Sequence, residues 1–83
     1  MSASVYYQPV KGKHLVMGGP SSFLELLRRI TSSNASSWEL DGHWTMQLTG
    51  AAHATEDFEY RAALGEIIEA IEKHGTIHVW AEY

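Results

Sequence analysis

The stretch "IEKHGTIHVWAEY", residues 71–83, decides how the rest of the sequence is interpreted. Its first half is typical of a helix end, because Lys73 and His74 favour a helix C-terminus and Gly75 suits the left-handed position beyond it. Its second half, residues 76–83, alternates apolar and polar side chains with a period of two and predicts a β-strand. One face of this strand holds Ile77, Val79 and Ala81, and the other holds His78, Trp80 and Glu82.

The helix that precedes this strand carries the clearest amphipathic pattern in the sequence. Thr55 is expected to cap its N-terminus, with Glu56 and Asp57 placed where the helix dipole favours anions. An apolar stripe at helical spacing predicts the buried side, and carboxylates lie roughly opposite as a solvated acidic surface. The stripe consists of Tyr60, Leu64, Ile67, Ile68 and Ile71, and the acidic surface of Glu59, Glu66 and Glu69. Glu69 also has the i,i+4 spacing of an ion pair with Lys73.

The first third of the sequence predicts one or two strands and a helix. Residues 3–10 are rich in β-branched and aromatic side chains, and Pro9 indicates an edge strand or a strand end. Residues 14–17 fit a second short strand, although this assignment stays open. A helix is expected at about 21–31, because Ser22 and Glu25 have the spacing of a capping box and apolar residues follow at helical spacing.

Asp41-Gly42 predicts a hairpin, since a two-residue type I′ turn requires positive φ at both central positions. In that register Leu40 pairs with His43 and Trp38 with Thr45, which places all four on one face. The competing interpretation puts a short helix within residues 46–53 instead.

The expected order is therefore strand, helix, strand, strand, helix, strand, within a single domain of residues 1–83. This is the split βαβ, or ferredoxin-like, α+β arrangement, with two helices on one face of a small antiparallel sheet. A different α+β order with a three-stranded meander is the alternative.

The sheet face without helices is expected to carry several large aromatic groups. The candidate binding residues on it are Tyr6, Trp38, His43, His78 and Trp80. Apolar patches of this kind often mark interfaces, where Trp and Tyr are enriched as hot spots. Three occupants are open: the chain's own segment 9–20, a second copy, and a different protein or ligand.

Composition excludes several classes of protein. The absence of cysteine removes disulfides, thiolate zinc sites and cysteine nucleophiles, and it favours a cytoplasmic protein. A net charge of −4, with only six basic residues in separate segments, argues against nucleic-acid binding. The sequence has neither a signal-peptide pattern nor an apolar run long enough to span a membrane.

Motifs for catalysis or metal binding are also missing from the sequence. The five histidines match no metal-ligand spacing, so no metal or cofactor is expected. The serines lack a G-x-S-x-G elbow, and Gly18-Gly19 lacks the lysine of a P-loop.

Three functions are weighed on this basis. The first is a non-enzymatic protein-interaction module, heteromeric or homodimeric, that uses the aromatic sheet face. The second is a ligand-binding or enzymatic dimeric α+β barrel with His43 or His78 as acid or base, since histidine titrates near neutral pH. The third is an acidic inhibitor-type protein that docks Glu59, Glu66 and Glu69 on a basic partner.

Overall fold

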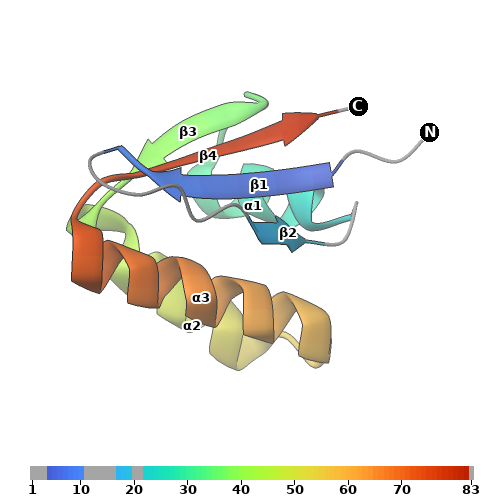
Figure 1. Ribbon diagram of the computed structural model, residues 1–83. Coiled ribbons are helices and arrows are strands. Elements are labelled where there is room, and N and C mark those ends of the chain that lie inside the picture. The colour runs from blue at the N-terminus through green and yellow to red at the C-terminus, as the bar shows by residue number, and fades with distance from the viewer. Residues whose placement is uncertain (1–3, 11–16, 20–21, 83) are drawn as a thin grey trace.

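The computed structural model describes residues 4–10, 17–19 and 22–82 and shows a small sheet with helices packed against it (Figure 1). In chain order the elements are β1 (Ser4–Pro9), β2 (Met17–Gly19), α1 (Phe23–Thr31), β3 (Ser37–Leu40), a short 3-10 helix η1 (Gly42–Trp44), α2 (Thr45–Ala54), α3 (Phe58–His74) and β4 (Ile77–Glu82). The strands lie in the order β2-β1-β4-β3, and every neighbouring pair is antiparallel. The chain is thus an α+β protein, as the sequence predicts.

One hydrophobic core lies between the sheet and the helices. Alternate residues of the two central strands enter it, so Val5 and Tyr7 of β1 and Ile77 and Val79 of β4 are buried. Helix α3 contributes the buried stripe that its spacing predicts, with Leu64, Ile67 and Ile71 buried. The alternation within β4 is confirmed, because His78 and Trp80 are only half-buried.

The predicted hairpin at Asp41-Gly42 is wrong. The Asp41 carboxylate accepts a hydrogen bond from the His43 N–H at 2.9 Å, and the Asp41 carbonyl accepts one from the Trp44 N–H at 2.9 Å. Asp41 therefore starts η1, which runs directly into α2. Gly42 does not have positive φ; among the glycines in the described ranges, only Gly75 does. The competing interpretation, a helix within residues 46–53, is confirmed, and Leu48 and Ala52 anchor it in the core.

The βαββαβ order with two helices is not the order found, because α2 occupies the place of the expected third strand and gives three α-helices over the described residues. The ferredoxin-like assignment fails for this reason. Of the second short strand considered at 14–17, residues 14–16 lie outside the described residues. Met17 begins β2 and pairs with Tyr7.

Helix α1 begins close to the predicted residue but without the predicted capping box. Ser22 already has helical dihedral angles, so its side chain does not cap the helix. Its hydroxyl instead accepts a hydrogen bond from the hydroxyl of Tyr60 on α3. The carboxylate of Glu25 turns to Arg28 at 3.0 Å.

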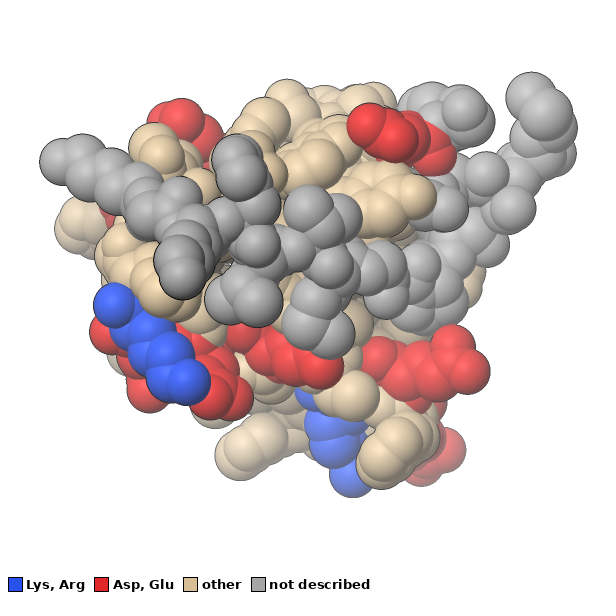
Figure 2. Space-filling view, in the orientation of Figure 1, with Lys and Arg blue, Asp and Glu red and all other residues tan. Residues whose placement is uncertain are grey.

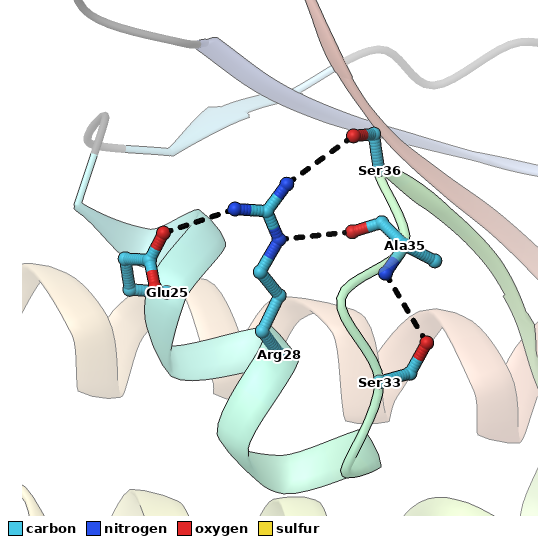
Figure 3. Close-up of polar contacts among 5 residues, drawn as sticks. All are labelled: Glu25, Arg28, Ser33, Ala35 and Ser36. Atoms are coloured by element: carbon cyan, nitrogen blue, oxygen red, sulfur yellow. Dashed lines mark hydrogen bonds and ion pairs between the residues drawn. The ribbon is translucent and has the colours of Figure 1, made fainter.

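Arg28 fixes the connection between α1 and β3 (Figure 3). Its guanidinium donates to the Ala35 carbonyl at 3.0 Å, to the Ser36 hydroxyl at 3.3 Å and to the Glu25 carboxylate at 3.0 Å. The planar fork of the guanidinium serves all three acceptors together, a geometry that lysine does not reproduce. This contact positions the entry into β3, and the carbonyl of Ser36, just before that strand, accepts from the Ala81 N–H of β4 at 2.9 Å.

We expect Arg28→Ala to lower the free energy of unfolding by about 1–2 kcal/mol, because the Ala35 carbonyl loses a charge-assisted donor. Arg28→Lys should recover less than half of that loss. Chemical denaturation of the variants measures the effect, with Arg29→Ala as the matched control because Arg29 is exposed on the same helix. Equal effects of Arg28→Ala and Arg29→Ala would refute this role.

The N-cap of α3 is Asp57, two residues beyond the predicted Thr55. The Asp57 carboxylate accepts from the N–H groups of Glu59 at 2.9 Å and Tyr60 at 3.2 Å. The Thr55 hydroxyl accepts from the Asp57 N–H at 3.2 Å and so supports the capping residue. The ion pair predicted between Glu69 and Lys73 is confirmed at 3.0 Å.

Asp57→Ala should destabilise the protein by about 1 kcal/mol, the usual effect of losing an N-cap side chain. Thr55→Ala should have a smaller effect, because it removes only a supporting hydrogen bond. Thermal or urea unfolding of both variants gives the ranking. If Thr55→Ala loses more stability than Asp57→Ala does, the N-cap is Thr55, as the sequence alone predicted.

Candidate functional site

Three aromatic side chains are in contact on the sheet face that the helices leave uncovered. Tyr6 of β1 and Trp80 of β4 are direct cross-strand partners, and their ring centroids lie 5.8 Å apart. His78 lies one step along β4 on the same face, with its ring centroid 5.1 Å from that of Trp80. All three are half-buried. We call Tyr6, His78 and Trp80 the aromatic face.

Two exposed carboxylates flank the aromatic face. The Glu82 carboxylate accepts a hydrogen bond from the Trp80 indole N–H at 3.2 Å, so Trp80 holds it close to the rings. Glu39 of β3 is the direct cross-strand partner of His78, on the same face. In Figure 2 the coloured side chains over the sheet are tan and red, and the blue ones lie below them, over the helices. The described part of this face is therefore aromatic at its centre and acidic at its flanks.

The structure brings together three of the five residues predicted for this face. Trp38 pairs with Val79, and Leu40 with Ile77, so both point toward the helices. Because side chains alternate along a strand, the register imposed by the false hairpin had placed them on the wrong side. His43 is not in a strand; it lies in η1 and is exposed there.

Glu39 is the residue that sequence reasoning missed. The hairpin register had placed it on the covered face, opposite to Trp38. The pairing of β3 with β4 reverses this assignment, and Glu39 lies beside His78. The signal that could have found it was the plain alternation of β3, in which Leu40 belongs to the core and Glu39 does not.

The indole N–H of Trp38 is buried and has no hydrogen-bond partner within residues 4–10, 17–19 and 22–82. Trp38 packs against the edge of the core. Its role in the described fold is therefore packing, not presentation of a polar group.

The three carboxylates predicted to form an acidic surface lie on α3, and Figure 2 shows red side chains gathered over this helix. Two of its three members already have intramolecular partners. Glu66 accepts a hydrogen bond from the Tyr7 hydroxyl at 3.0 Å, and Glu69 pairs with Lys73 at 3.0 Å. Glu59 is exposed at the first turn of the helix. These contacts leave less free acidic surface than the sequence indicates.

The bond between Tyr7 and Glu66 ties the centre of the sheet to α3. Burial raises the pKa of the Tyr7 hydroxyl above its ordinary value. The neighbouring Glu66 carboxylate raises this pKa further, because it accepts a hydrogen bond from the protonated hydroxyl and because its negative charge disfavours the phenolate. Tyr7 therefore keeps its proton as a structural donor.

The described residues provide no group of three or more histidine, aspartate or glutamate side chains able to hold a metal ion. The two histidines considered as an acid or base lie on different elements, His43 in η1 and His78 in β4. The described helices include none with the length and apolar character needed to span a bilayer.

Comparisons of the chain with protein-family models, with curated proteins and with solved structures give no match. Any functional argument therefore depends on the chemistry of the site itself.

Proposed function

We propose that this chain is a non-enzymatic protein-interaction module that binds its partner through the aromatic face. The observation that carries the proposal is the contact of Tyr6, His78 and Trp80 on the one sheet face without helices. The absence of cysteine further supports a cytoplasmic place of action.

A partner binds best to a surface that offers large apolar area and loses little side-chain conformational entropy on binding. The rings contact one another in the chain without a partner, so we expect binding to immobilise few further torsions. Trp and Tyr are also the residue types that most often dominate binding energy at interfaces.

A binding role is favoured over catalysis because the aromatic face is not part of a described cavity. A hollow of about 390 Å³ beside α1 and the α2–α3 connection is lined by Leu26, Arg29, Ile30, Ala51, Ala54, Thr55 and Tyr60. None of the aromatic face contributes to it, or to a second hollow of about 250 Å³ that is lined by Val10, His74, Gly75 and Thr76. General acid–base catalysis requires a substrate held in place beside the acid or base. The cross-strand partner of His78 is Glu39, and because Glu39 is exposed, it does not enclose a substrate site at His78.

Site-specific photo-crosslinking tests the proposal. A benzoylphenylalanine at position 6 should trap a discrete partner in the cells that express the protein, and Trp80→Ala should abolish that product. The matched controls are the same group at Phe58 and at Met46, which are 78% and 83% exposed and lie on helices away from the sheet. Equal trapping at all three positions, or none at position 6, would refute an interaction through this face.

Trp80→Ala must also leave the fold intact for this test to be read. Because Trp80 is half-buried outside the core cluster, we expect a smaller loss of stability from it than from truncation of a core residue. Circular dichroism and urea unfolding of the variant check this expectation.

A further inference from the structure

Charge on the aromatic face identifies the chemistry of a partner. The described side chains of this face, from alternate positions of β1, β3 and β4, are Tyr6, Gln8, Ser37, Glu39, His78, Trp80 and Glu82. Only Glu39 and Glu82 carry a formal charge with the histidine neutral, and both are exposed carboxylates. The described part of the face thus has acidic flanks and contains neither lysine nor arginine.

An aromatic centre between carboxylates suits a cation. The π-face of tryptophan or tyrosine attracts a cation with about 0.5–1 kcal/mol at exposed sites, and with about 2 kcal/mol when water is excluded. Trp80 is already oriented by the hydrogen bond from its indole N–H to Glu82, and that carboxylate has further lone pairs free to accept from a guanidinium or an ammonium. On the other flank, Glu39 offers a second acceptor beside His78.

The same charges disfavour two other occupants. A second copy docked face to face would bring the Glu39 and Glu82 carboxylates of both copies together, and the described residues of this face provide no lysine or arginine to separate them. Like charges across an interface oppose binding. A phosphate backbone would meet the same repulsion.

We infer that the partner presents arginine or lysine side chains that lie over the aromatic face between Glu39 and Glu82. This inference rests on the proposed interaction function and specifies its chemistry. Arginine fits better than lysine, since its planar guanidinium stacks on aromatic rings and binds a carboxylate with two parallel hydrogen bonds.

A titration followed by NMR tests the inference. The probes are blocked pentapeptides of the form Gly-Xaa-Ser-Xaa-Gly, in which both Xaa residues are arginine, lysine, norleucine or glutamate and lie on one side of an extended peptide. The readout is the indole N–H signal of Trp80, assigned by its loss in Trp80→Phe. Trp38 and Trp44, which lie elsewhere in the fold, serve as internal controls.

The arginine peptide should shift the Trp80 signal saturably, with little change at Trp38 and Trp44. Glu39→Gln combined with Glu82→Gln should raise its Kd at least fivefold. The matched control is Glu59→Gln combined with Glu72→Gln, which removes the same charge from exposed positions of α3. This control variant should bind like the wild type.

Several outcomes would overturn the inference. Norleucine binding as strong as arginine binding would show an apolar partner and leave the interaction function standing. An equal loss of affinity for the arginine peptide in both double variants would show that binding depends on net charge and not on Glu39 and Glu82 in particular. If the arginine peptide binds only after Lys11→Ala combined with Lys13→Ala, the cation comes from the chain itself. If no peptide shifts Trp80, the cationic partner is refuted, and photo-crosslinking decides separately on the interaction function.

Discussion

Replacement of Ile67 by alanine is expected to lower the free energy of unfolding by about 2–5 kcal/mol, the range typical of a fully buried isoleucine. Ile67 is 0% exposed and lies between Leu64 and Ile71 on the stripe that α3 packs against the sheet. Helix α3 contacts β1, β2 and β4, so we expect a cavity on its buried stripe to weaken the packing of the helix on the sheet. In a domain this small, such a loss is a large fraction of the total stability.

Urea denaturation of the wild type and Ile67→Ala measures this effect. Phe58→Ala is the matched control, because Phe58 is on the same helix but 78% exposed, and surface substitutions usually change stability by less than about 0.5 kcal/mol. An unfolding midpoint unaffected by Ile67→Ala would mean that α3 packs with a different face.

The second large effect concerns alkaline pH and Tyr7. The pKa of its hydroxyl is raised in the folded state above the ordinary value of about 10. The folded state therefore binds this proton more tightly than the unfolded state does. The stabilisation is fully present below the unfolded pKa and is lost as pH rises above it, at up to about 1.4 kcal/mol per pH unit for one proton.

Tyr7→Phe isolates this contribution, because the other titrating groups are common to both proteins. Near pH 8 the variant should be less stable by about 1 kcal/mol, since Glu66 loses its donor. Above pH 10 the difference should shrink and then reverse, because only the wild type has a phenol to deprotonate at position 7. Denaturation curves at intervals from pH 8 to 11.5 measure it. Stability curves that stay parallel over this range would show that Tyr7 does not titrate abnormally.

The strand β4 and the helix α3 could be predicted from sequence because each carries a complete local signal. The alternation from Ile77 onward and the helical stripe through Ile67 are both decided by burial against one core. The hairpin could not be judged in this way. Asp41-Gly42 suits a type I′ turn and an Asp-capped helix equally well, and the choice depends on whether Leu48 meets the core from a helix or from a strand.

That one ambiguity explains most of what was missed at the candidate site. Tyr6, His78 and Trp80 belong to strands whose alternation was correctly assigned, and they share a face. Trp38 and Glu39 exchanged sides because their register was inferred from the turn and not from the pairing of β3 with β4. The alternation of residues 37–40 alone separates Leu40 from Glu39, but the partner strand is a tertiary property, which this local pattern does not give.

The position of β4 within the sheet has a consequence for the order of folding. β1 and β3 do not pair with each other; both pair with β4, which follows them in sequence. Before residues 77–82 join, the sheet consists only of the β1–β2 ladder, and an isolated two-stranded ladder is marginal in water. Contacts of such long sequence separation, as between Ser4 and Glu82, also slow folding. Completion of the sheet therefore depends on the strand that follows β1, β2 and β3 in sequence, so we expect the sheet to form cooperatively and not element by element.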